Sequence, residues 1–163
     1  DLAELRARGR IAFADAIDLI HRRADEAGQR LVIRDWSHLD FTGVPFVANP
    51  AYRLLTAEAL ASRFELRQVC TVRHPLDQWL SLRQLAVVQG KLTLDLFLAG
   101  YRRFAEQAEA IGFFRYEDFA ADPSTILKEL CRRLEMRFDR HFTERWSSYA
   151  SVTGDVARKA FPS

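Results

Sequence analysis

A strand-to-helix junction at residues 71–84, TVRHPLDQWLSLRQ, constrains the fold of this chain more than any other stretch. The residues that lead into it, ELRQVCTV (65–72), end in β-branched residues, as a buried strand does. Pro75 cannot donate a hydrogen bond within a central strand, and the apolar residues that follow it recur with helical spacing. The junction therefore predicts a strand that ends before Arg73 and a helix that follows it.

Helices and strands alternate along the rest of the chain. Hydrophobic periodicity predicts helices at residues 2–27, 56–63 and 94–110, with Gly28 as the carboxyl cap of the first. The residues expected to face inward from the 94–110 helix are Leu94, Phe97, Leu98, Tyr101, Phe104 and Ala108. Strands are expected at 30–36, 65–72 and 113–119. This order predicts a single α/β domain over residues 1–163, with at least three strands in a parallel sheet flanked by helices.

Arg73 and Ser81 stand on opposite sides of the junction. An arginine at the end of a strand and a serine about two turns into the next helix can close on one anion, through a guanidinium fork and a hydroxyl. The alternative is a surface ion pair between Arg73 and Asp77, with Ser81 an ordinary helix residue. The pair by itself leaves both readings open.

A second segment, FFRYEDFAADPSTILKELCRRLEM (113–136), reads as a strand, a loop with Asp122 and Pro123, and an amphipathic helix. Arg-x-Pro followed by serine, then Arg-Tyr-Glu-Asp, then Asp-Pro opening a helix, resembles the sulfotransferases that use 3'-phosphoadenosine 5'-phosphosulfate (PAPS). The similarity runs from about Leu31 to Asp155. It implies a sulfotransferase fold of the P-loop nucleoside-triphosphate-hydrolase type. Alternatively, Tyr116, Glu117 and Asp118 are only the solvated end of a strand.

The resemblance also implies roles for individual residues. Arg73 and Ser81 would bind the 3'-phosphate, and Tyr116 would lie near the adenine. Gly154 and Arg158, in SVTGDVARK (151–159), resemble the late family loop that folds over the nucleotide, although a turn before a solvated basic tail gives the same pattern. The implied reaction transfers a sulfuryl group to a hydroxyl or amine of a small-molecule or glycan acceptor. It releases adenosine 3',5'-bisphosphate (PAP) and needs no metal.

The residues after the first predicted strand, IRDWSHLDFTG (33–43), supply candidates for a catalytic base. Ligands of open parallel sheets bind outside the carboxyl ends of the strands. By resemblance, His38 is the general base on the acceptor hydroxyl, and its near-neutral pKa suits that task. The alternative for His38 is a loop-ordering or capping role. Asp35 and Asp40 are either alternative bases and acceptor contacts, or turn residues.

The family's amino-terminal phosphosulfate-binding loop has no counterpart in the sequence. No two of the seven glycines are close enough to build a loop that grips a phosphate before a helix. We therefore expect a chain truncated at its amino end and possibly at its carboxyl end. A natural homologue without the loop is the alternative. Competing functions are a non-catalytic nucleotide-binding or scaffold protein of the same fold and a small-molecule kinase.

Composition limits the remaining function classes. The net charge of +2 gives no case for nucleic-acid binding. No run approaches the roughly 18 apolar residues of a membrane span, and no signal-peptide pattern opens the sequence, so we expect a cytoplasmic protein without membrane partners. Cys70 and Cys131 lack metal-ligand spacing and lie in apolar patterns, which predicts buried free thiols.

Overall fold

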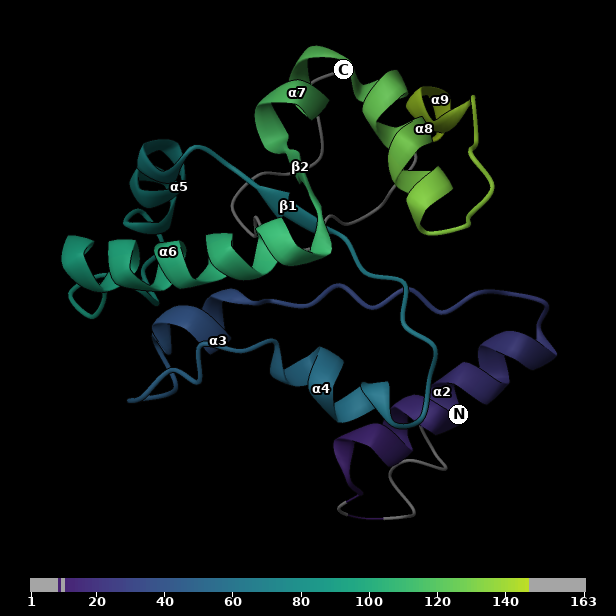
Figure 1. The fold of residues 1–163 in the computed structure, drawn as a ribbon, viewed down its shortest axis with the longest axis horizontal. Helices are drawn as coiled ribbons and strands as arrows, with labels where there is room; N and C mark the ends of the chain where they lie inside the picture. The colour runs from purple at the N-terminus through teal and green to yellow at the C-terminus, as the bar shows by residue number, and fades with distance from the viewer. Residues whose placement is uncertain (1–8, 10, 147–163) are drawn as a thin grey trace.

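The computed structural model describes residue 9 and residues 11–146, whose arrangement Figure 1 shows. Their elements, in chain order, are α2 (Phe13–Glu26), α3 (His38–Thr42), α4 (Leu55–Ala61), β1 (Cys70–Val72), α5 (Pro75–Leu82), α6 (Leu94–Ile111), β2 (Phe113–Arg115), α7 (Tyr116–Ala121), α8 (Pro123–Arg133) and α9 (Phe142–Trp146). Helices dominate this part of the chain, and its sheet is one parallel pair of strands. The expected α/β class is confirmed at this level.

The two strands are short and parallel. Cys70 pairs with Phe113 and Val72 with Arg115. The Cys70 amide also donates to the carbonyl of Gly112, at 3.1 Å, which extends the ladder by one residue. Parallel neighbours need a crossover connection, which α5 and α6 supply here. The carboxyl ends of both strands consequently lie at the same edge.

Helix α6 packs against β1 and α5. Its Phe97 is 2% exposed and joins Val44, Val88 and Leu92 in the buried core. Trp79 of α5 packs against this cluster, with its ring 5.6 Å from that of Phe97. The apolar face of α5 and one face of α6 therefore share a core, and this packing fixes where β1 ends relative to α6.

Helix α3 packs on α6 at very close range. A Cβ on Gly100 would collide with the carbonyl oxygen of Phe41, so only glycine permits this approach. The rings of Phe41 and Phe104 meet edge to face, 5.4 Å apart. In Figure 1, α6 lies between α3 on one side and β1 and α5 on the other.

The structure confirms several of the predicted helices. The helix predicted at 56–63 is α4, the one after Arg73 is α5, and the one at 94–110 is α6. Gly28 follows α2 with φ of 65°, and its amide donates to the carbonyl of Asp25. That geometry is the left-handed carboxyl cap that glycine favours. Cys70 and Cys131 are buried free thiols, as predicted.

The expected strands are wrong in number and in length. Residues 30–36 form no strand, because no neighbouring strand among the described residues pairs with them. Only Cys70–Val72 of the 65–72 segment, and only Phe113–Arg115 of the 113–119 segment, are β-structure. The described residues thus hold two strands, where three were predicted. Tyr116 begins helix α7 instead of ending a strand.

Two further expectations about helices are corrected. The helix predicted over residues 2–27 is not continuous from residue 2: Gly9, Ile11 and Ala12 are not helical, and α2 begins at Phe13. Residues 1–8 and 10 lie outside the described part. Leu94 and Leu98 are 41% and 43% exposed, so they do not face the core. The buried residues of α6 are Phe97, Gly100 and Ala108.

Candidate functional site

A hollow of about 270 Å³ lies where the carboxyl ends of β1 and β2 meet α6. Its lining combines charged and polar side chains from the strand ends with small apolar residues from the helix. The lining residues are Val72, Arg73, His74, Pro75, Tyr101, Ala105, Ala108, Phe113, Arg115 and Glu117. The sequence predicted a ligand site at this sheet edge, and the hollow lies there.

Arg73 and Tyr116 are brought together at this edge. The Arg73 guanidinium carbon lies over the Tyr116 ring, 5.1 Å from its centre. A cation in this position is attracted by the negative face of the ring. The Tyr101 hydroxyl donates to the backbone carbonyl of Arg73 at 2.7 Å, which holds the end of β1 on α6. Burial, and then the negative charge of Glu117, raise the pKa of Tyr101, so its hydroxyl stays a donor.

Glu117 makes a second tie between the two strand ends. Its carboxylate accepts a hydrogen bond from the backbone N–H of His74 at 2.7 Å. This bond satisfies the amide that precedes Pro75 and lowers the pKa of Glu117, so the carboxylate is ionised at neutral pH. Arg115 lies 3.9 Å from carboxylate oxygens of Glu117 and Asp118. An ionised carboxylate thus lies beside Arg115 in the lining of the hollow.

The sequence did not single out Tyr101 or Glu117 as parts of this site. Tyr101 was expected only to face inward, and Glu117 stood in the quoted Arg-Tyr-Glu-Asp motif without a role. The amide of His74 needs an acceptor, and this is the one signal that could have pointed to a nearby side chain. Which side chain supplies that acceptor depends on the strand pairing, which spacing alone does not give.

Ser81 is placed less favourably than Arg73. It is exposed on the last turn of α5, and no contact joins it to Arg73. At about 1.5 Å per residue, the length of α5 separates the two by roughly 10 Å along the helix. Any shared anion would have to lie between them. The alternative ion pair between Arg73 and Asp77 is absent from the described part of the chain.

His38 opens helix α3, which lies on the opposite side of α6 from β1 and α5 (Figure 1). Its ring stacks on Trp36, with centres 5.6 Å apart, and lies 3.2 Å from the Thr42 hydroxyl. Burial lowers the pKa of His38, and a hydrogen bond to the backbone of Val44 partly opposes that shift. The neutral imidazole that a general base requires is therefore favoured at pH 7. His38 does not line the hollow at Arg73.

Asp35 and Asp40 both hold the start of α4. The Thr56 hydroxyl donates to Asp35, and the Leu55 amide donates to Asp40, each at 3.0 Å. Burial raises the pKa of Asp40, although the bond from Leu55 acts in the opposite direction. These contacts favour the alternative that the two carboxylates are turn residues.

Gly154 and Arg158 lie outside the described residues. Within the part that is described, no group of three or more His, Cys, Asp or Glu side chains could hold a metal ion. No helix in that part is long and apolar enough to cross a membrane.

Comparison with known proteins gives no independent assignment: no family model, curated protein or solved structure matches the chain. The functional argument therefore rests on the two motifs and on the contacts between their residues.

Proposed function

We propose that this chain is the nucleotide-binding part of a sulfotransferase, an enzyme that transfers a sulfuryl group from PAPS to a hydroxyl or amine of a small-molecule or glycan acceptor. One observation carries the proposal. Arg73, from the first motif, lies over the ring of Tyr116, from the second, at the shared carboxyl edge of two parallel strands. Two segments far apart in sequence thus meet where such sheets bind ligands.

The residues at this edge fit a nucleotide phosphate. No carboxylate among the described residues forms an ion pair with Arg73, so its guanidinium donors are available to an anion. Tyr116 is 51% exposed and can offer ring surface to a purine. In this proposal Arg73 and Ser81 hold the 3'-phosphate, and Tyr116 lies on the adenine side.

The proposed reaction is a direct transfer. A bond forms between the acceptor oxygen or nitrogen and sulfur while the bond from sulfur to the 5'-phosphate oxygen breaks, and PAP leaves. His38 takes the proton of the attacking group, for which its lowered pKa suits it. The sulfuryl group is at the 5' end of the donor, away from the 3'-phosphate. A base beside Arg73 is therefore not required.

A nucleotide-binding protein without catalysis of its own is the second candidate. The position of His38 in α3, outside the lining of the Arg73 hollow, favours it. The two candidates share the phosphate site and differ in turnover, so the experiments below address binding first and catalysis second.

Calorimetric titration with PAP and with adenosine 5'-monophosphate tests the phosphate site. The two ligands differ in the 3'-phosphate, so tighter binding of PAP measures recognition of that group. Arg73→Gln should weaken PAP binding by at least about tenfold, because it removes charge-assisted hydrogen bonds, and should leave the monophosphate little affected. Tyr116→Ala should weaken both ligands alike.

Arg102→Gln is the matched control, because Arg102 has a side chain 83% exposed on α6 and does not line the hollow. Equal affinity for the two nucleotides, or PAP binding unchanged by Arg73→Gln, would refute the phosphate site. Sulfation by the complete gene product then separates the two candidates. His38→Ala should abolish turnover and spare PAP binding in the enzyme, whereas the wild-type binding protein should show no turnover.

A further inference from the structure

The peptide group between Arg73 and His74 is held on both sides by side chains. Its carbonyl accepts a hydrogen bond from the Tyr101 hydroxyl, and its N–H donates to the Glu117 carboxylate, each at 2.7 Å. Tyr101 belongs to α6 and Glu117 to α7, so two different helices hold one peptide group. Because the C=O and N–H of a trans peptide point in opposite directions, the two hydrogen bonds fix the plane of this group.

These two hydrogen bonds act where the backbone has left the sheet. Val72 forms the last pair of β1, with Arg115, so Arg73 and His74 lie beyond the ladder. A residue before proline favours the extended conformation, and His74 is extended, with ψ of 128°. The freedom that remains is rotation of the Arg73–His74 peptide about its two flanking backbone bonds. The hydrogen bonds from Tyr101 and to Glu117 restrict that rotation.

The two side chains are themselves held in place. The Tyr101 ring packs on the core cluster and lies 5.7 Å from the ring of Phe97. Glu117 is half-buried and directly follows Tyr116, whose ring faces the Arg73 guanidinium. Arg73 is thus held at its side chain by Tyr116 and at its following peptide by the next residue of α7. The direction of the Arg73 side chain is therefore set before any anion binds.

We propose that Tyr101 and Glu117 are positioning residues of the phosphate site. They hold the Arg73–His74 peptide and so direct the Arg73 guanidinium across the Tyr116 ring toward the anion. This role rests on the proposed function, because the anion for which Arg73 is positioned is the 3'-phosphate. It also gives the glutamate of the Arg-Tyr-Glu-Asp motif a task, which is to accept a backbone amide of the strand-to-helix junction.

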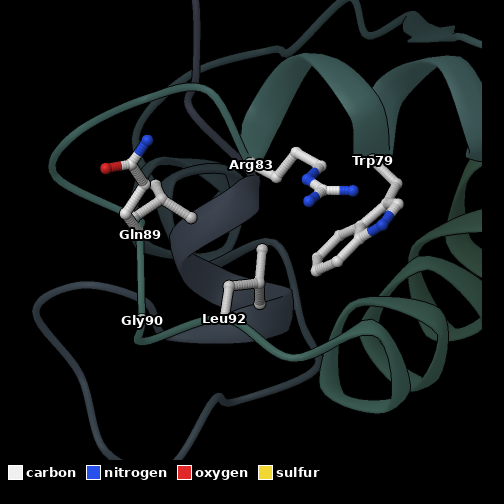
Figure 2. A pocket seen from close by; sticks show the side chains of 6 residues that line it. Trp79, Arg83, Gln89, Gly90 and Leu92 are labelled. Atoms are coloured by element: carbon white, nitrogen blue, oxygen red, sulfur yellow. The ribbon is translucent and has the colours of Figure 1, made fainter.

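Arg83, at the other end of α5, provides an internal reference. Figure 2 shows it beside Trp79, at the edge of a second hollow that neither Tyr101 nor Glu117 lines. Arg83 is exposed and is the carboxyl cap of α5, and the N–H of the peptide after it donates to the backbone carbonyl of Ser81. Changes at Tyr101 or Glu117 should therefore leave the surroundings of Arg83 unaltered.

The Nε–H signals of Arg73 and Arg83 in two-dimensional NMR of the nucleotide-free protein test the positioning. A guanidinium over an aromatic ring experiences the ring current, so the Arg73 Nε proton should resonate upfield. Glu117→Ala and Tyr101→Phe should each move this signal toward its ordinary position. Glu117→Gln keeps an acceptor oxygen for the His74 amide and should largely restore the signal. The Arg83 signal should stay in place in all three variants.

Titration with PAP and with adenosine 5'-monophosphate tests the consequence for binding. Glu117→Ala should reduce the preference for PAP about fivefold, because a loosely held Arg73 must be ordered by the ligand, whereas Glu117→Gln should keep it. Asp118→Ala is the matched control, because Asp118 is the next residue of α7, also lies 3.9 Å from Arg115, and does not line the hollow. It removes the same charge and should bind PAP at least as tightly as the unaltered protein.

The outcomes separate this role from the proposed function. If the unaltered protein does not prefer PAP, the phosphate site is refuted and the positioning role falls with it. If it prefers PAP, an Arg73 signal unmoved by both Glu117→Ala and Tyr101→Phe would overturn the positioning role alone. Tighter PAP binding by both alanine variants would also overturn it, because Glu117 would then act only through its charge. The preference compares two ligands on the same folded protein, so a merely less stable variant leaves it unchanged.

Discussion

Residues 30–36 and 65–72 both have β-favouring sequences, yet only the second segment contains a strand. Cys70–Val72 pairs with Phe113–Arg115, which α6 places alongside it. Residues 30–36 have no such neighbour among the described residues, and Val32, Ile33 and Trp36 are 58%, 40% and 47% exposed. The difference teaches that a strand is completed by its hydrogen-bonding partner, and that β propensity only permits it.

The largest loss of stability should follow a change in the core on which α6 packs, next to the paired strands. Phe97→Ala removes a side chain that is 2% exposed and packed in the core, so it should lower the free energy of unfolding by about 3–5 kcal/mol. Leu98→Ala, next along the same helix and 43% exposed, should cost less than about 1 kcal/mol. Urea unfolding of both variants measures this contrast. Similar losses would mean that the core around Phe97 does not fix α6 more firmly than the exposed side chains of that helix do.

Gly112 connects α6 to β2, and its replacement should cause the next largest loss in the free energy of unfolding. It has φ of 98° and ψ of 140°, a combination that is essentially restricted to glycine. An added Cβ would also meet the Arg133 guanidinium, the end of a flexible side chain that can move aside. Gly112→Ala should therefore cost about 1–3 kcal/mol in thermal or urea unfolding.

Gly90→Ala is the matched control for this prediction. Gly90 also has a positive φ, 72°, but its added Cβ would meet nothing within 4 Å. Both replacements strain the backbone, but only Gly112 combines its positive φ with a ψ of 140°, so Gly112→Ala should cost more. If Gly90→Ala were the more destabilising of the two, the link between β2 and its turn would be weaker than its geometry indicates.

The tie between Tyr101 and the end of β1 should have a smaller effect. Tyr101→Phe deletes the hydroxyl that donates to the Arg73 carbonyl, at a cost of about 1 kcal/mol. Amide hydrogen exchange should accelerate in Cys70–Val72 and remain the same in residues 30–36, which have no ladder to lose. Faster exchange in both segments would indicate that they are coupled.

The free energy of unfolding should also fall in acid because of His38, which begins α3 just after residues 30–36. Burial lowers its pKa below the unfolded value of 6.5, so the unfolded chain binds more protons as the pH falls below that value. The stabilising contribution is complete above pH 6.5 and is lost as the pH decreases toward the folded pKa. His38→Gln should flatten this part of the pH profile of urea unfolding. His21→Gln, which keeps His38, should retain it.

The sequence predicted the helices better than the strands for a physical reason. The period of α6 and the Pro75 start of α5 are local signals, and both helices formed where expected. The lengths of β1 and β2, and the absence of a strand at 30–36, depend on partners far along the chain. In the site, the strand-to-helix motif placed Arg73 at a ligand edge. The ties from Tyr101 and Glu117 required the actual pairing of β1 with β2.

The smallest expected effect directly tests the unpaired segment. Val32→Thr keeps the shape and β propensity of a side chain that is 58% exposed, so it should change the free energy of unfolding by no more than about 0.5 kcal/mol. The same replacement at Val88, 1% exposed, buries a hydroxyl and should cost about 1–3 kcal/mol. A loss at Val32 as large as that at Val88 would mean that another surface covers residues 30–36 in solution. In that case residues 30–36 would be paired or covered like Cys70–Val72, and the contrast between the two segments would no longer hold.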